Sequence, residues 1–230
     1  MKPWLVKQWC IPTESSAEFV WKMEDVLDVY TRAYEEGHVL VCMDEATKQQ
    51  IMEVRQPVPP APGREYRYDA EYQRNGVSNL FMFVAPLEAW RHVEVTNQRT
   101  AVDWATVVRQ LVDEHFPKAR KIVLVMDNLN THSPSSLYEA FSPQEAKRIL
   151  DKLEIHYTPK HGSWLNMAEI ELSVLSRQCL SRRIPDQQTL RREVAAWSNA
   201  RNAQGATVDW RFTTDNARIK LKRLYPSFVV

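Results

Sequence analysis

The segment 121–130, KIVLVMDNLN, decides the fold of this chain. Five consecutive apolar residues, three of them β-branched, are typical of a strand buried on both faces of a sheet. The strand ends at Asp127, whose carboxylate is not stable in a buried position without partners. Because open α/β sheets build their sites at the carboxyl ends of strands, this segment predicts a functional acid at a strand end.

A second segment, 38–47 (HVLVCMDEAT), has the same pattern and ends at Asp44. Glu45 follows directly and is the competing candidate. Successive residues of a strand point to opposite faces, so only one of these two acids can share a site with Asp127.

Length and composition predict a folded globular protein. The chain has 230 residues, 44% of them hydrophobic, and eight Trp. No apolar run approaches the roughly 20 residues of a membrane helix, and the N-terminus is not a signal peptide, so we expect a cytoplasmic protein without a membrane partner. Cys10, Cys42 and Cys179 lack the spacing of a zinc site and are interpreted as thiols in a reducing cytosol.

Charge is unevenly distributed, although the net charge is only +1. Residues 182–223 contain ten Arg or Lys against four Asp or Glu, whereas acids dominate residues 14–45. This layout is compatible with a polyanionic partner on one side of the protein.

Hydrophobic periodicity and turn signals predict the order of elements. We expect strands at 38–44, 77–85, 90–96, 121–126 and 154–159, and helices at 17–35, 100–115, 137–141, 143–153, 167–182 and 187–201. Residues 51–58 are either a short strand or an extended arm. This order is that of an α/β fold, a ribonuclease H-like mixed five-stranded sheet flanked by helices. Its first and fourth strands are neighbours, which brings Asp44 close to Asp127.

The domain organisation follows from the same reading. We expect an N-terminal arm or linker with one helix at 1–37, the ribonuclease H-like domain at 38–203, and a basic C-terminal tail packed on it at 204–230.

A third acid is expected on the helix after the last strand. Phosphoryl transfer on nucleic acid uses two divalent cations about 3.5–4 Å apart, and Mg²⁺ prefers carboxylates with water and phosphate. The segment 161–172, HGSWLNMAEIEL, offers Glu169 and Glu171, which on a helix point roughly 200° apart and cannot both enter one site. Glu169 is alternatively part of a capping box with Asn166, and Glu171 is expected to be a solvated helix residue.

Three ordered segments carry a family resemblance: MDEAT (43–47), LVMDNLNTH (124–132) and YTPKHGSWLNMAEIE (157–171). They resemble the catalytic segments of DDE transposases, and more closely the bacterial insertion-sequence branch of the mariner superfamily, the IS family numbered six-thirty. Alignment of Leu165-Asn166 with the family's Leu-Asn favours Glu169 over Glu171. The departure from the family pattern is Ser163-Trp164, where Ser-Pro-Asp is common.

The resemblance implies a function and a site. It implies Asp44, Asp127 and Glu169 as the catalytic residues and as ligands of Mg²⁺ or Mn²⁺, with two ions bound. It also implies hydrolysis at transposon ends and strand transfer into target DNA by a homodimer on double-stranded DNA, in a bacterial, nucleoid-associated protein.

Supporting roles are expected for residues that flank the acids. Asn128, Asn130 and His132 would orient a metal ligand or a DNA phosphate, and Lys160, His161 and Asn166 precede the third acid. The candidate DNA-binding residues are Arg182, Arg183, Arg191, Arg192, Lys220, Lys222 and Arg223; about half of these basic residues are expected on a solvated helix face.

A complete transposase of this family carries N-terminal helix-turn-helix units, and the 43 residues before Asp44 are too few for a pair of them. We therefore expect a catalytic domain without the helix-turn-helix region. Two alternatives stay open: another ribonuclease H-like nuclease, and a transposase remnant that only binds DNA or dimerises.

Overall fold

The computed structural model describes residues 16–33, 35–67 and 70–226 of the chain. A five-stranded mixed sheet forms its centre, with strand order β3-β2-β1-β4-β5. The strands are β1 (His38–Glu53), β2 (Tyr72–Ala85), β3 (Trp90–Thr96), β4 (Lys121–Met126) and β5 (Leu153–Tyr157). The expected fold class is confirmed, and the first and fourth strands are neighbours as predicted.

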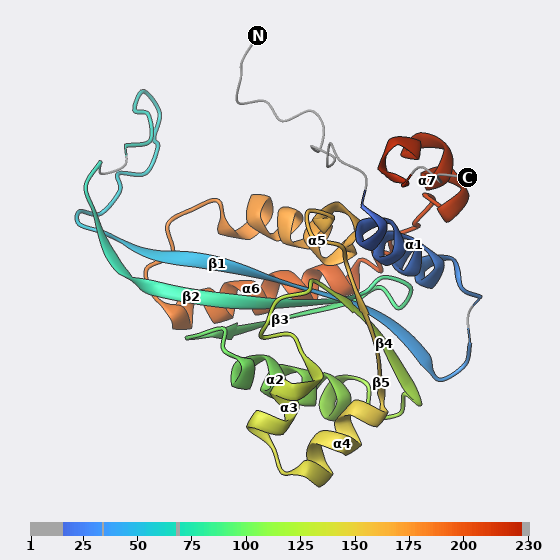
Figure 1. Ribbon diagram of the computed structural model, residues 1–230. Coiled ribbons are helices and arrows are strands. Elements are labelled where there is room, and N and C mark those ends of the chain that lie inside the picture. The colour runs from blue at the N-terminus through green and yellow to red at the C-terminus, as the bar shows by residue number, and fades with distance from the viewer. Residues whose placement is uncertain (1–15, 34, 68–69, 227–230) are drawn as a thin grey trace.

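Helices cover both faces of the sheet (Figure 1). One face packs against α1 (Ala17–Thr31), α5 (Met167–Leu175) and α6 (Gln187–Ala203), and α7 (Thr214–Lys220) adds Ala217 to the same core. The opposite face packs against α2 (Ala101–Gln110), α3 (Pro134–Ala140) and α4 (Pro143–Asp151). The strands β1, β2 and β4 therefore contribute alternate residues to two separate cores, which is why their apolar runs are continuous.

Short irregular helical segments extend several of these helices. Two are π-helical turns, η1 (Leu111–His115) after α2 and η3 (Ser176–Leu180) after α5. Two are 3₁₀ turns, η2 (Ser163–Leu165) before α5 and η4 (Lys222–Leu224) after α7. The helix expected at 167–182 is thus α5 followed by η3.

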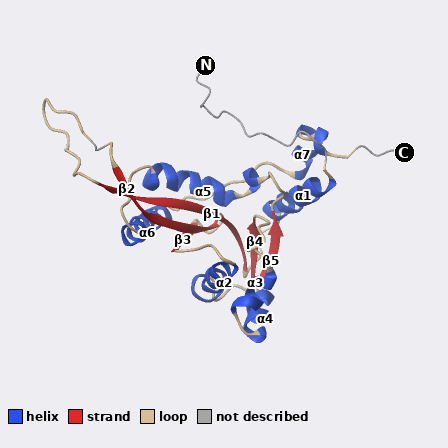
Figure 2. Cartoon of the chain, turned by 60° about the vertical axis from the view of Figure 1, so that its left-hand side comes forward, coloured by secondary structure: helices blue, strands red, loops and turns tan. Residues whose placement is uncertain are grey.

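The hairpin of β1 and β2 is longer than the sequence pattern predicts. It stays paired from Cys42 with Val84 to Glu53 with Tyr72, with one irregularity between Gln49 and Ile51. Its far end extends beyond the helices (Figure 2). The first six residues of β2 are exposed on both faces, so no apolar alternation marks this part of the strand in the sequence, and residues 51–53 continue β1 instead of forming a separate strand.

The segment after α6 packs against α1. Arg218 Nε donates to Glu24 Oε1 at 2.9 Å, and Thr214 Oγ1 donates to Asp28 Oδ1 at 2.6 Å. Leu221 and Leu224 add to the core on the same face. Among the described helices, none has both the length and the apolar character needed to cross a bilayer.

Candidate active site

The parallel pairing of β1 and β4 places the first two acids side by side. The register pairs Cys42 with Val125, and two residues further along each strand lie Asp44 and Asp127. Alternate residues of a strand point to the same face. Asp44 and Asp127 therefore point to the same face as Cys42 and Val125, which belong to the core under α1 and α5. The two carboxylates therefore face the side of the sheet on which α5 packs.

Asn166 ties the helix that carries Glu169 to the strand that carries Asp44. Its side-chain Nδ2 donates to the Met43 carbonyl oxygen at 2.7 Å, and its Oδ1 accepts from the Ala168 N–H at 3.0 Å. The residue thus caps α5 and ties the start of that helix to β1, one residue before Asp44. Glu169 lies in the first turn of α5. The Asn166 N–H donates to Ser163 O at 2.8 Å, so the alternative of a capping box with Glu169 is wrong.

The turn before α5 depends on Gly162. Its N–H donates to Pro159 O at 2.9 Å. A Cβ at this position would lie 2.5 Å from Pro159 Cγ and 3.0 Å from the Pro159 carbonyl oxygen. Only glycine permits this close approach, which sets where η2 and α5 begin.

Burial raises the pKa of two of the three carboxyl groups, and neighbouring charge adds to the shift in one of them. Burial raises the pKa of Asp44 to about 7; the Glu45 N–H lowers it in part, and the charges of Asp127 and Glu169 raise it further. Burial also raises the pKa of Glu169, while the Ser163 hydroxyl lowers it in part. Burial is the largest cause of the raised pKa in both groups, and only for Asp44 do the neighbouring carboxylates add to it.

His132 connects the two faces of the sheet. Its Nδ1–H donates to Asp127 Oδ1 at 2.5 Å and its Nε2–H donates to Glu45 Oε1 at 2.7 Å. Burial alone would lower the pKa of His132, but the hydrogen bonds and charges of Asp127 and Glu45 outweigh burial and raise it to about 9. The doubly protonated ring therefore donates to both carboxylates and fixes the orientation of Asp127.

Glu45 lies on the face opposite Asp44. Its side chain is almost fully buried, and besides His132 it lies 3.8 Å from Arg99 Nη1. The prediction that only one of Asp44 and Glu45 faces Asp127 thus agrees with the alternation along β1. Sequence reasoning missed Glu45 as the second partner of His132, because that contact depends on the path of the 127–132 loop.

Glu171 is not the solvated residue that its position suggested. It is 1% exposed. Its Oε1 accepts from Arg201 Nη2 at 2.8 Å, and its Oε2 lies 3.4 Å from Arg91 Nε. Arg91 is itself buried and points inward with Val93 and Val95 on β3. Arg91 occupies the same face of β3 as two apolar residues, and this alternation is the sequence signal that could have predicted a buried guanidinium.

The donor set fits a divalent cation. Asp44, Asp127 and Glu169 offer only carboxylate oxygens, the ligands that Mg²⁺ and Mn²⁺ prefer. Glu169 Oε2 is enclosed and accepts no hydrogen bond from the described protein atoms, so its lone pairs are available to a cation. Across the described ranges, no three acidic, histidine or cysteine side chains lie close enough together to hold one ion.

The other supporting candidates lie on loops around the acids. Asn128 and Asn130 are exposed beyond β4, and Lys160 and His161 are exposed between β5 and η2. His161 adopts a left-handed backbone conformation, with φ of 63°. Their roles stay predictions.

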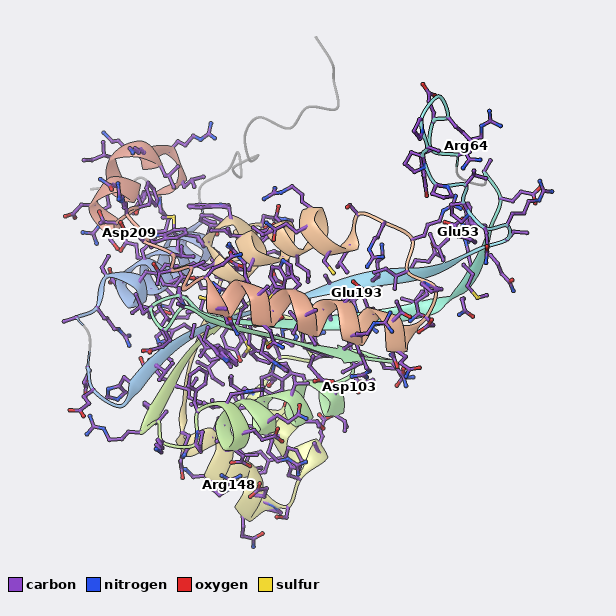
Figure 3. The ribbon with its side chains drawn as sticks, turned by 180° about the vertical axis from the view of Figure 1, so that it is seen from behind. Glu53, Arg64, Asp103, Arg148, Glu193 and Asp209 are labelled. Atoms are coloured by element: carbon purple, nitrogen blue, oxygen red, sulfur yellow. The ribbon has the colours of Figure 1, made fainter. Side chains whose placement is uncertain are left out.

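Several candidate DNA-binding residues form ion pairs within the chain. Glu193 on α6 and Glu53 at the far end of the β1–β2 ladder (Figure 3) are two of the acids involved. The pairs are Arg182 with Glu193, Arg183 with Glu53, Arg191 with Glu94, and Arg192 with Glu193. Lys220 lies 5.7 Å over the Phe212 ring, and Lys222 and Arg223 are exposed.

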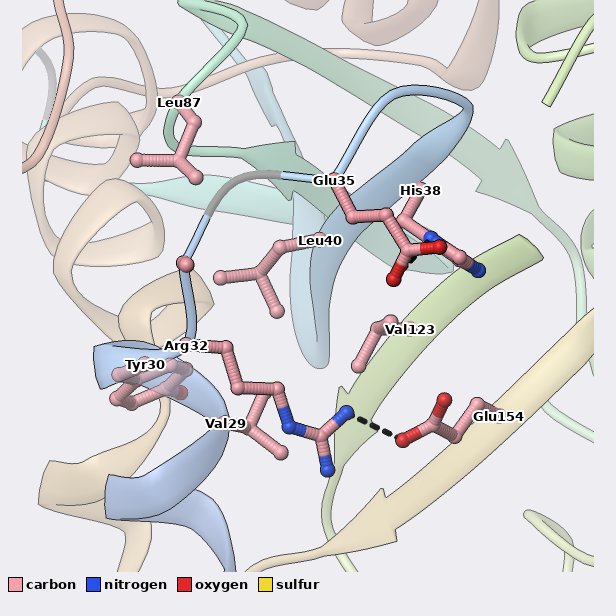
Figure 4. Close-up of a pocket in the computed structure, with 10 residues that line it drawn as sticks. Val29, Tyr30, Arg32, Glu35, His38, Leu40, Leu87, Val123 and Glu154 are labelled. Carbon is pink, nitrogen blue, oxygen red and sulfur yellow. Dashed lines mark hydrogen bonds and ion pairs between the residues drawn. The ribbon is translucent and has the colours of Figure 1, made fainter. Parts of the chain in front are cut away.

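A separate cavity of about 110 Å³ lies at the other end of the same strands. Val29, Leu40 and Val123 line it, and Arg32 forms an ion pair with Glu154 beside them (Figure 4). Leu40 precedes Asp44 by four residues, or about 13 Å of extended strand. This cavity therefore does not belong to the site of the three acids.

Comparison of the sequence with protein families gives one match that includes all three acids. The family model described as DDE superfamily endonuclease matches residues 39–191, more than half of the chain. The chain belongs to the DDE superfamily endonucleases. A search of curated proteins gave no match.

Solved structures of the Mos1 mariner transposase share the fold. The Mos1 mariner paired-end complex with Mn has a TM-score of 0.58 at 14% identity, over 90% of this chain and 63% of that chain. The Mos1 strand transfer complex has a TM-score of 0.57 at 14% identity, over 89% and 62%. A pre-cleavage Mos1 transpososome has a TM-score of 0.58 at 12% identity, over 99% and 69%. The chain thus spans less than two thirds of the first two proteins.

Proposed function

We propose that this DDE endonuclease domain is the catalytic domain of a transposase, which cleaves DNA at transposon ends and joins them to target DNA. The observation that carries the proposal is the placement of acids within the matched segment: two at corresponding positions of the neighbouring strands β1 and β4, and one in the first turn of α5, which Asn166 ties to β1. The order and spacing of these acids also resemble the insertion-sequence branch of the mariner superfamily. Mos1, which shares the fold, is described in paired-end and strand transfer complexes.

Asp44, Asp127 and Glu169 are the proposed ligands of Mg²⁺ or Mn²⁺. Two bound ions would activate the attacking oxygen and stabilise the leaving oxygen at one phosphate. Mos1 complexes with Mn and with Mg support this choice of ions. His132 holds Asp127 through one oxygen and leaves the other available for a ligand role.

The proposed reaction has two steps. In cleavage, a water oxygen forms a bond to phosphorus as a phosphorus–oxygen bond of the DNA strand breaks, which leaves a 3′-hydroxyl and a 5′-phosphate. In strand transfer, that 3′-hydroxyl attacks a target phosphate and releases a second 3′-hydroxyl. Neither step needs an oxidant or a covalent enzyme intermediate, so positioned carboxylates are sufficient protein chemistry.

The proposed partners are double-stranded DNA and a second copy of the chain. The exposed Lys222 and Arg223, together with the charge excess of residues 182–223, support DNA as the polyanion. A paired-end complex of Mos1 supports a homodimer on DNA.

A nicking assay tests the proposal. The wild-type chain is expected to nick supercoiled plasmid DNA with Mn²⁺ and not with EDTA, whereas Asp127→Asn is expected to be inactive and to keep its circular dichroism spectrum. Equal nicking by Asp127→Asn would contradict the assignment. A labelled RNA–DNA hybrid, cleaved in preference to DNA duplex, would instead identify another ribonuclease H-like nuclease. Absence of any cleavage by the wild type, with DNA binding retained, would identify a remnant.

A further inference from the structure

A groove of about 510 Å³ begins at Glu169 and follows the outer side of α5 into η3. Its wall on the helix side comes from Glu169, Ile170, Ser173, Ser176 and Arg177, and Trp164 of η2 lines it as well. The groove is therefore continuous with the site of the three acids.

Polar residues form one stripe of the helix surface along this groove. Ser173 follows Glu169 by four residues, and Arg177 follows Ser173 by four, which places the three side chains on one face. Ser173, Ser176 and Arg177 are exposed. Arg177 Nη1 donates to Ser173 Oγ at 2.9 Å, so the guanidinium is turned back along the helix toward Glu169.

Arg177 differs from the arginines that follow it. Within the part of the chain that the structure describes, it forms no ion pair with a carboxylate, whereas Arg182, Arg183 and Arg191 each do. A guanidinium presents donors that match phosphate oxygens. Among the residues that line this groove, Arg177 is the one positively charged side chain, and it is free to bind an anion.

Trp164 forms a fixed part of the groove wall. Its ring packs edge-on against Phe212, with centroids 5.9 Å apart, so the wall next to Glu169 is held in place by the segment that follows α6.

We propose that this groove binds the sugar–phosphate backbone of the DNA strand next to the scissile phosphate, with Arg177 as a phosphate contact and Ser173 and Ser176 as hydroxyl donors. Arg177 follows Glu169 by eight positions, about 12 Å along a helix axis, which corresponds to about three or four nucleotides of a duplex strand. The inference rests on the proposed function only for the position of the scissile phosphate.

Arg177→Gln tests this inference, with Arg109→Gln as the matched control. Arg109 is also exposed, but it belongs to α2 on the opposite face of the sheet. Affinity for a short fluorescent DNA duplex is measured by anisotropy with EDTA present, across about 50–200 mM salt. Arg177→Gln is expected to bind about fivefold more weakly and to lower the salt slope by about 0.9; Arg109→Gln is expected to match the wild type.

Two outcomes would contradict the proposed binding of DNA in the groove. One is a wild-type salt slope in Arg177→Gln; the other is an equal loss in both variants, which would trace the effect to net charge alone. Because binding is measured without divalent cations, either result is independent of the nicking assay. If the wild type nicks DNA but Arg177→Gln keeps the wild-type salt slope, the groove is rejected and the proposed function is kept. If Arg177→Gln lowers the salt slope but the wild type does not nick DNA, the groove is kept and the proposed function is rejected.

Discussion

Two clusters of buried or half-buried charge lie on the two sides of α5 and differ in how charge is balanced. Glu171 is neutralised by Arg91 and Arg201, whereas Glu169 shares its surroundings with Asp44 and Asp127 and has an oxygen without a donor. The first arrangement is what a stable interior requires, since a buried charge needs a partner. In the second cluster the protein supplies no neutralising partner for Glu169, so this negative charge is available to a bound cation.

Removal of a carboxylate from the acid cluster is expected to have the largest effect. Glu169→Gln should reduce Mn²⁺-dependent nicking at least about a thousandfold, as loss of a catalytic group does in other enzymes. It should not lower the melting temperature, because the substitution relieves repulsion. The measurement is plasmid nicking beside thermal unfolding, and nicking within tenfold of the wild type would remove Glu169 from the site.

Substitution of the paired glutamate should give the reverse result. Glu171→Gln leaves Arg91 without a countercharge inside the protein, which is expected to lower the free energy of unfolding by about 3 kcal/mol. Nicking per folded molecule should stay near the wild-type level at low temperature. Denaturant unfolding checks the loss of stability, and an unchanged midpoint would show that the ion pairs contribute nothing.

His132 is expected to affect the acid cluster through Asp127. His132→Gln removes the cation between Asp127 and Glu45, so nicking should fall about 10–100-fold, as for other residues that orient a metal ligand. A higher Mn²⁺ concentration should be needed for half-maximal nicking, a change that general destabilisation does not produce. An unchanged Mn²⁺ dependence would contradict the orienting role.

The smallest expected effect is the pH dependence of stability in the metal-free protein. The Asp44 carboxyl has a pKa of about 7 when folded and about 3.9 when unfolded, so the folded state binds the proton more tightly. Stability in EDTA should fall as pH rises from about 4 to about 7. Asp44→Asn should then be about 2 kcal/mol more stable than the wild type at about pH 8 and equal to it near pH 4. Parallel curves for the two proteins would show that folding does not raise the pKa of Asp44.

Sequence patterns predicted the acid cluster better than the paired cluster. Asp44 and Asp127 each end a strongly apolar run, and the strand order that such runs predict is observed. Glu171 was misjudged because its partners come from β3 and α6, and no local pattern on α5 reports them. The contact between His132 and Glu45 was missed for the same reason, because these two residues are 87 positions apart in the sequence.

The far half of the β1–β2 hairpin also escaped prediction, for a different physical reason. Strand prediction relies on one buried face, and residues 72–77 are exposed throughout. Backbone pairing between Ile51 and Arg74 continues the ladder there without any apolar pattern. Apolar patterns in a sequence therefore indicate which residues are buried, but they do not indicate backbone pairing between exposed residues.

Anomalous diffraction from crystals grown with Mn²⁺ tests the central claim most directly. We expect an anomalous peak bounded by carboxylate oxygens of Asp44, Asp127 and Glu169, with none beside Glu171, and loss of that peak in Asp127→Asn. Crystals with full Mn²⁺ exposure that show no peak among these three acids, or a peak that persists in Asp127→Asn, would contradict the assignment of the site.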